Sequence, residues 1–427
     1  MKGSKRAATL GIFAIAGAGC SAPAPGAVIH LDDLPRLVAI EELRIGDLDD
    51  PGAGFSRISA MDVDRDGNLY VVEASVPEIR VFDPAGAIIR RIGRRGEGPG
   101  EFTAAPRFGV HGDTVWTVEG RGSRMTHFDR RGRVLATGRT DGVSVHLPTG
   151  VGGVIPWAMR PDGQFTGYLG RITYTRNASP SGVLPTDSIP VPFVLFDVTG
   201  TVTDTIGWSG RPPPRMWRPP SEESANAGTI DVGGRQFFVP NPPTTLPWWE
   251  AREDGYLSVE TPLAPTSGEG IVRVTRIGTA ADTLFSNILH YRPAPYTGPD
   301  LDSIAARAAR GEEGGFVPFF VGADAPPPPS NWEAIAHALR GAMDFPEFQL
   351  PLSYPWVAQD GSVWLRLSIR PGEPQRWIVL DAKGRARGLI DLPDEARVAW
   401  HRGDRFWAAI PDEFGVPWAV QYRIEEG

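Results

Sequence analysis

Four acidic residues near the start of the chain have the spacing of a calcium-binding loop. Asp62, Asp64 and Asp66 occupy alternate positions, and Glu73 follows where the last ligand of such a loop stands. Carboxylates in this pattern converge on Ca²⁺ when the loop wraps around the ion, as in an EF-hand. Residues 69–73 alternate like a β-strand, however, and no helical segment flanks the loop. We therefore favour an ordinary turn between two strands and no cofactor, with Ca²⁺ as the alternative.

Other catalytic patterns are weaker still. The seven histidines are scattered, and none forms a pair at metal-ligand spacing. The sequence contains no Gly-x-Ser-x-Gly elbow, no phosphate-binding P-loop and no Cys-x-x-Cys pair. These patterns favour a non-catalytic protein over an enzyme.

Aromatic and basic residues gather in a proline-rich stretch between residues 207 and 250. They are candidates for stacking on a sugar or a peptide and for meeting an anionic partner. The alternative is that they only fill the rim of the fold. The candidate binding residues are Arg215, Trp217, Arg218, Trp248 and Trp249.

A short sequence motif that recurs with a period of 46 residues predicts the secondary structure that would position these candidate side chains. Tyr70 and Trp116 are 46 residues apart, and so are Phe82 and Phe128. Each copy of the motif combines a turn containing glycine with strands of alternating polarity. A period of about 40–50 residues built from strands and turns is typical of a β-propeller, with one blade in each repeat.

Six such repeats are recognisable, and the third and fourth are the most divergent. The last repeat has only three strands before the chain ends, whereas residues 36–45 form an extra strand before the first repeat. Pairing the two would close the ring and remove an open sheet edge. We therefore expect an all-β fold, a six-bladed β-propeller with its N-terminal strand in the last blade.

The first repeat and its tail resemble an NHL repeat. The resemblance is carried by residues 66–83 and above all by the Gly-x-Gly-Pro-Gly-x-Phe tail that ends at Phe102. It is strong over residues 56–140, moderate over 354–424 and weak between them. The whole chain resembles the bacterial six-bladed propeller lipoproteins related to NHL-repeat proteins, which implies an envelope protein with a binding role.

Two insertions interrupt the regular spacing of the repeats. The proline-rich residues 207–250 are expected to run over a face or a rim of the propeller, because proline is excluded from central strands. Residues 299–345 are expected to be helical. A capping box at residues 330–333 begins a helix whose apolar face includes Ile335 and Leu339, and we expect this face to pack on the propeller as a cover or a lid.

The N-terminus resembles a bacterial lipoprotein signal. Lys2, Lys5 and Arg6 precede a short apolar run that is too short to span a bilayer, and the run ends at Cys20, the only cysteine of the chain. The resemblance implies cleavage before Cys20 and lipidation of its thiol. We therefore assign residues 1–20 to the signal, 21–34 to a tether and 35–427 to one propeller domain. An ordinary secretory signal is the alternative.

These features predict a lipid-anchored protein of the bacterial cell envelope that acts as a binding or scaffold module. Its partner would be an envelope protein, a peptide or a glycan, and the chain is expected to be a monomer. With a formal charge of −8 the sequence does not favour nucleic acid as a partner. The alternative is a propeller enzyme, a metal-dependent lyase or a hydrolase, with its site in the central channel.

Overall fold

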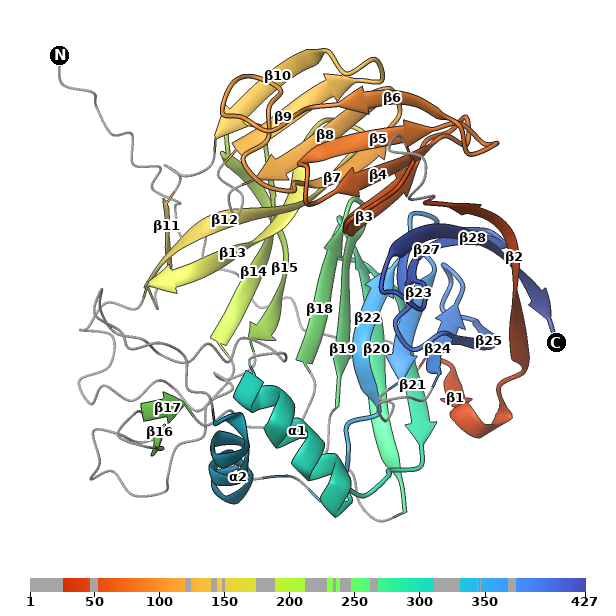
Figure 1. Cartoon of the computed structure of the whole chain (residues 1–427). Coiled ribbons are helices and arrows are strands. Elements are labelled where there is room, and N and C mark those ends of the chain that lie inside the picture. The colour runs from red at the N-terminus through yellow and green to blue at the C-terminus, as the bar shows by residue number, and fades with distance from the viewer. Residues whose placement is uncertain are drawn as a thin grey trace.

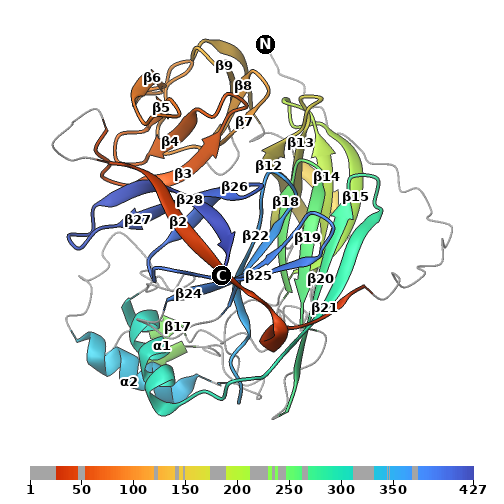
Figure 2. The same cartoon turned by 90° about the vertical axis from the view of Figure 1, so that its right-hand side faces the viewer.

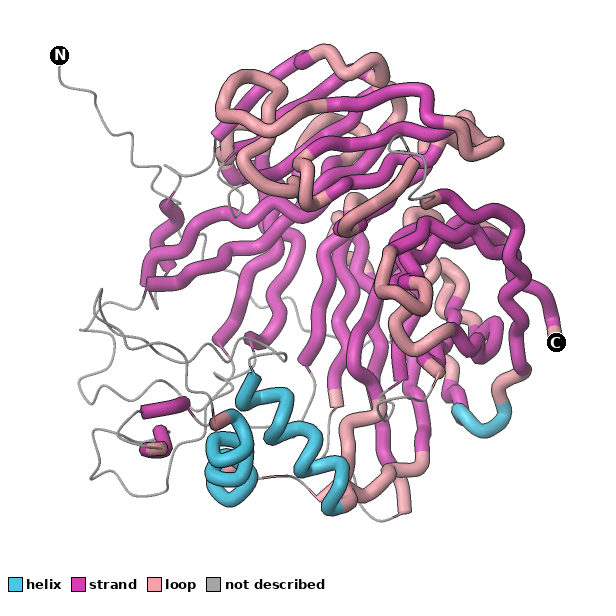
Figure 3. The backbone as a smooth tube through the Cα atoms, viewed as in Figure 1, coloured by secondary structure: helices cyan, strands magenta, loops and turns pink. Residues whose placement is uncertain are grey.

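The structure is a computed structural model of the whole chain. It describes residues 26–46, 53–119, 124–139, 144–147, 150–173, 189–211, 229–232, 236–238, 247–261, 268–310, 331–343, 345, 347–367 and 374–427. Figure 3 shows that strands dominate these residues and that the two α-helices lie together at one side.

Six antiparallel four-stranded units form the body of the molecule (Figure 1). Blade 1 contains β3 (Ile58–Val63), β4 (Leu69–Glu73), β5 (Glu78–Phe82) and β6 (Ile88–Ile92). Blade 2 contains β7 (Arg107–His111), β8 (Thr114–Glu119), β9 (Arg124–Asp129) and β10 (Val134–Arg139). Blade 3 contains β12 (Gly150–Met159), β13 (Phe165–Thr173), β14 (Ile189–Phe196) and β15 (Val202–Arg211), and β11 (Ser144–Leu147) pairs with β12.

The second half of the ring repeats this arrangement. Blade 4 contains β18 (Pro247–Arg252), β19 (Gly255–Glu260), β20 (Gly270–Gly278) and β21 (Thr283–Tyr291). Blade 5 contains β22 (Leu352–Val357), β23 (Val363–Leu367), β24 (Gln375–Leu380) and β25 (Ala386–Leu392). Blade 6 contains β26 (Arg397–Arg402), β27 (Arg405–Pro411), β28 (Pro417–Glu426) and, as its outermost strand, β2 (Arg36–Ile45).

The closing strand β2 confirms the predicted closure of the last blade. It pairs antiparallel with β28 from Leu37 opposite Glu426 to Ile45 opposite Ala419, so an N-terminal strand and the last strand of the chain share one sheet (Figure 2). Two residues of β2 also pair in parallel with β25, which joins blades 5 and 6 into one eight-stranded sheet.

A repeated turn explains the period that is visible in the sequence. Asp83 directly follows β5. Its Oδ1 accepts hydrogen bonds from the main-chain N–H groups of Ala85 and Ala87, at 3.0 and 2.9 Å. Gly86 adopts φ 89°, a conformation that favours glycine. Asp129 with Gly132 and Asp381 with Gly384 build the same turn in blades 2 and 5. A short local motif therefore fixes the return of the outer strand in these three blades.

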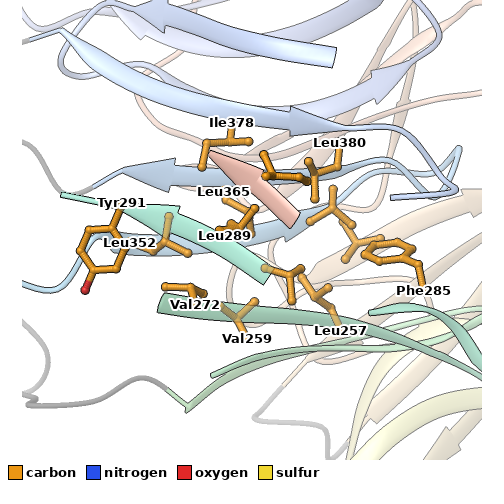
Figure 4. Packing of buried hydrophobic residues seen from close by; sticks show 14 of the residues in the cluster. Leu257, Val259, Val272, Phe285, Leu289, Tyr291, Leu352, Leu365, Ile378 and Leu380 are labelled. Carbon is orange, nitrogen blue, oxygen red and sulfur yellow. The ribbon is translucent and has the colours of Figure 1, made fainter. Parts of the chain in front are cut away.

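A hydrophobic cluster fills each space between neighbouring blades. Figure 4 shows the cluster between blades 4 and 5, where Leu257 and Leu289 meet Leu365 and Ile378. Separate clusters lie between blades 5 and 6, 6 and 1, 1 and 2, 2 and 3, and 3 and 4. Since every neighbouring pair of blades shares a core, the ring is closed. Trp116, Trp364 and Trp407 belong to this core, as predicted.

The insertions differ from the predictions in their boundaries. Strand β15 continues to Arg211 and β18 begins at Pro247, so the proline-rich insertion is shorter than residues 207–250. Part of it forms the small hairpin of β16 (Thr229–Asp231) and β17 (Gln236–Phe238). The predicted tether, residues 21–34, also contains structure: β1 (Val28–His30) pairs in parallel with β21, and a 3-10 turn (Leu31–Asp33) follows. Backbone pairing to an open sheet edge, which composition does not reveal, explains this difference.

The helical insertion is confirmed as α1 (Gly298–Arg310) and α2 (Trp332–Ala342). The cap of α2 is Asn331, whose Oδ1 accepts from the Ala334 N–H at 3.0 Å, one residue later than the predicted capping box. Our expectation that α2 packs on the propeller is wrong. Ile335 and Leu339 pack against Ala305 and Ala309 of α1, so the two helices bury their apolar faces against each other. Among the described residues, neither helix is long and apolar enough to cross a membrane.

Candidate functional site

The inner strands of all six blades line one central cavity of about 520 Å³. This size lies within the range of small-molecule sites. The inner strands are β3, β7, β12, β18, β22 and β26. A site at this place uses every repeat of the fold, because each blade contributes one wall.

The strand register places one equivalent residue from each blade in this cavity. In blade 1 it is Asp62, which precedes Val63, and Val63 pairs with Leu69, the first residue of β4 that has a buried side chain. Applying the same rule to the other blades gives Gly109, Ala158, Glu250, Trp356 and Trp400. All six residues line the cavity.

This ring of equivalent residues is asymmetric. The two acids belong to blades 1 and 4, which face each other across a six-membered ring. Small residues, Gly109 and Ala158, separate the acids on one side, and Trp356 and Trp400 separate them on the other. At the level of this ring, Trp356 and Trp400 form a tryptophan wall opposite two short side chains, and Trp116 and Trp157 of blades 2 and 3 also line the cavity.

The two acids link neighbouring blades. Asp62 Oδ2 accepts the main-chain N–H of Val110 in blade 2 at 2.7 Å, and Glu250 Oε2 accepts the N–H of Val357 in blade 5 at 3.1 Å. Val110 and Val357 occupy equivalent positions, so both acids satisfy the same inner-edge donor of the next blade. Both are buried, with 7% and 6% of their surface exposed.

Burial shifts the ionisation of both groups. It raises the pKa of Asp62 to about 7, although hydrogen bonds from the Val110 and Val63 N–H groups oppose the shift. It also raises the pKa of Glu250 to about 7, opposed chiefly by the charge of Arg252. As the pH falls through about 7, both carboxyl groups become neutral and the cavity becomes more positive.

Polar contacts cross the channel where the inner strands end. Gln359 donates to Asp62 Oδ1, and its Oε1 accepts from Trp400 Nε1 at 3.3 Å and from Arg402 at 2.7 Å. His111 Nδ1 lies 3.4 Å from Glu253 Oε2, which joins blades 2 and 4. These contacts connect side chains of different blades at that end of the channel.

A Ser–His–Asp cluster lies between blades 5 and 6, but its geometry is not that of a nucleophilic triad. Ser362 Oγ lies 2.8 Å from Nδ1 of His401, and Asp360 Oδ2 lies 3.6 Å from the same nitrogen. A triad needs the serine and the acid on opposite ring nitrogens. His401 is fully buried against Trp364, so the cluster ties the blades together.

The four residues of the predicted calcium loop are not brought together. Asp62 faces the central cavity, and Glu73 accepts the main-chain N–H groups of Ser56 and Ser75 at 2.9 and 2.8 Å. Asp64 and Asp66 both contact the guanidinium of Arg130. In the part of the chain that the structure describes, no group of three His, Cys, Asp or Glu side chains could hold a metal ion.

The predicted binding residues are separated in a different way. Arg215, Trp217, Arg218 and the lipidation site Cys20 lie outside the described residues. We predicted Trp248 and Trp249 to lie in a loop, but they lie in β18, the inner strand of blade 4. Trp249 packs edge-on against Tyr168 and Phe193, at ring distances of 4.3 and 5.0 Å. Packing between blades 3 and 4 therefore explains Trp249.

The comparisons with known proteins agree with this architecture. Residues 54–140, which contain blades 1 and 2, match a family model described as a 6-bladed beta-propeller. The chain is a six-bladed β-propeller. No curated protein matches its sequence.

Several solved structures are similar to this propeller at low sequence identity. A putative exported protein from Bacteroides fragilis has 12% identity and a TM-score of 0.46, over 93% of this chain and 100% of that one. Virginiamycin B lyase from Staphylococcus aureus has 10% identity and a TM-score of 0.31, over 86% of this chain and 83% of that one. The calcium-binding protein regucalcin from Agrobacterium tumefaciens has 9% identity and a TM-score of 0.34, over 91% of this chain and 96% of that one.

Proposed function

We propose that the propeller is a lipid-anchored module of the bacterial cell envelope that binds a ligand in its central cavity without converting it. The observation that carries this proposal is the cavity of about 520 Å³, which combines the tryptophan wall, further aromatic side chains from blades 2 and 3 and a few fixed polar groups. Small-molecule sites have this mixture of apolar surface and sparse polar groups.

Blocking the cavity tests the binding role. Ser59 lines the cavity and its side chain is exposed, so Ser59→Trp adds bulk there without entering the core. In a thermal-shift screen of sugars, peptides and envelope metabolites, we expect a compound that raises the Tm of the wild type by several degrees. The same compound should leave Ser59→Trp unchanged. A compound that stabilises both proteins equally would place the site elsewhere.

The alternative is an enzyme, and it is favoured by the two buried carboxyl groups with pKa values of about 7. Such groups suit general acid–base catalysis near neutral pH. Mass spectrometry of the stabilising compound after incubation with the wild type separates the two functions, because a binding protein returns its ligand unchanged. Conversion that is lost in Asp62→Asn and Glu250→Gln would support the enzyme.

The membrane anchor is a separate part of the proposal and rests on the sequence around Cys20. We expect Cys20→Ser to abolish labelling of the chain by a clickable fatty acid in bacteria, while the wild type is labelled and sediments with membranes. Serine lacks the thiol that receives the lipid. Wild-type protein that carries no lipid would contradict the anchor and favour a secreted chain.

A further inference from the structure

Two arginines of the central cavity differ from the other ionised groups around it. Arg107 begins β7 in blade 2, and Arg397 begins β26 in blade 6, so they lie on either side of blade 1. Both line the cavity, and both are exposed to it. They lie where the inner strands begin, opposite the end at which Gln359 lies.

Neither guanidinium has an acidic partner among the described residues. Arg107 donates to the carbonyl of Pro156, and Arg397 donates to the carbonyl of Ile58 at 2.6 Å. Other partly or fully enclosed arginines are paired with carboxylates: Arg80 with Glu78, Arg124 with Glu119, and Arg276 with Asp254. A guanidinium has five N–H donors, so a single carbonyl leaves most of them free.

The surroundings partly desolvate this charge. The channel walls desolvate both groups and lower the pKa of Arg107 and of Arg397, and the positive charge of Arg57 adds to the effect on Arg397. A cation that is partly removed from water is stabilised by an anion at hydrogen-bonding distance. The acids of the cavity do not fill this role, because Asp62 and Glu250 are committed to main-chain N–H groups.

The rest of the cavity wall completes a binding site. The guanidinium of Arg107 lies over the ring of Trp157 at 4.5 Å, which holds its plane in place. Ser59, between the two arginines in blade 1, adds a hydroxyl group, which donates to the Val72 carbonyl at 3.5 Å. The cavity also contains four arginines against three carboxyl groups, although the whole chain has a formal charge of −8.

We propose that the ligand of the central cavity is an anion, whose carboxylate, phosphate or sulfate group binds at Arg107 and Arg397 while an apolar part lies along the tryptophan wall. This inference rests on the proposed function, because it names the class of ligand for the same cavity. Arginine suits all three groups, since its planar fork offers two parallel donors to two oxygens.

Calorimetric titration of the full chain in non-ionic detergent tests the proposal, with inorganic phosphate, sulfate and benzoate as probes at constant ionic strength. We expect saturable binding that Arg107→Gln or Arg397→Gln weakens by about tenfold or more, the range for a charge-assisted pair. Arg90→Gln is the matched control, because Arg90 also donates to a carbonyl, that of Arg130, but lies on an outer strand. It should bind like the wild type. Tighter binding of benzoate than of phosphate would support the apolar contact, because only benzoate carries a ring.

A second pair of variants keeps the test informative if glutamine disturbs folding. Arg107→Lys and Arg397→Lys retain the charge but lose the fork, and we expect weakened but measurable binding. Affinities that are equal in the wild type and all cavity variants would overturn the proposal. So would a wild type that binds none of the three anions. If the thermal-shift screen then still finds an uncharged ligand that Ser59→Trp excludes, the binding role stands and only the anionic class is wrong.

Discussion

Removal of β2 is expected to prevent the chain from folding into a cooperative unit. A chain that starts at residue 53 loses the strand that pairs with β28 along its whole length. It also loses Leu37 from the core between blades 5 and 6, and Ile45 from the core between blades 6 and 1. The exposed edge of β28 would then be free to pair with other chains. We expect aggregation, or a loss of the sharp thermal transition, in circular dichroism.

A circularly permuted chain distinguishes the effect of losing β2 from the effect of changing the order in which the strands are connected. The Gly427 N–H donates to the Arg36 carbonyl at 3.1 Å, so a short linker after Gly427 can lead directly into residues 35–46 as a hairpin. We expect this permuted chain, starting at residue 53, to melt cooperatively. A chain starting at residue 26 serves as the control with native order. Cooperative melting of the chain without β2, within a few degrees of the control, would contradict the closure.

Trp364→Ala is expected to cause the largest loss of stability among single substitutions in the core. Trp364 is fully buried, and its ring contacts Trp356, Trp377 and Phe406. Truncating a buried tryptophan removes apolar burial and leaves a cavity, at a typical cost of about 3–5 kcal/mol. Because these rings come from both blades 5 and 6, the loss acts on the packing between blades. We expect a lower urea midpoint with an unchanged slope.

The matched control for this substitution is Trp208→Ala. Trp208 lies in β15 and is 54% exposed, so its removal should change the free energy of unfolding by no more than about 0.5 kcal/mol. Equal effects of the two substitutions would contradict the assignment of Trp364 to the core between blades.

The sequence predicts the blades well because their signals are local. Asp83 and Gly86 specify a turn within five residues, and the same turn recurs at Asp129 and Asp381. The unpaired strand at residues 36–45 and the incomplete last blade together predicted the closure, which β2 confirms. The helices α1 and α2 were also predicted from local periodicity and capping.

The arrangement of the cavity could not be predicted, because it depends on the register between distant strands. Glu250 was assigned to the end of a proline-rich insertion, so its equivalence to Asp62 in blade 1 was invisible. Arg107 and Arg397 are 290 positions apart in the sequence and become neighbours of β3 only when the ring closes. The mutual packing of α1 and α2 is missed for the same reason, since an apolar face does not say which surface covers it.

Native mass spectrometry of the chain purified from the cells that make it tests the central claim, that the cavity holds the ligand, most directly. The account predicts a small bound molecule on the wild type, at one per chain, and its absence from Ser59→Trp. A molecule retained equally by both proteins would contradict the claim and place the binding surface outside the cavity.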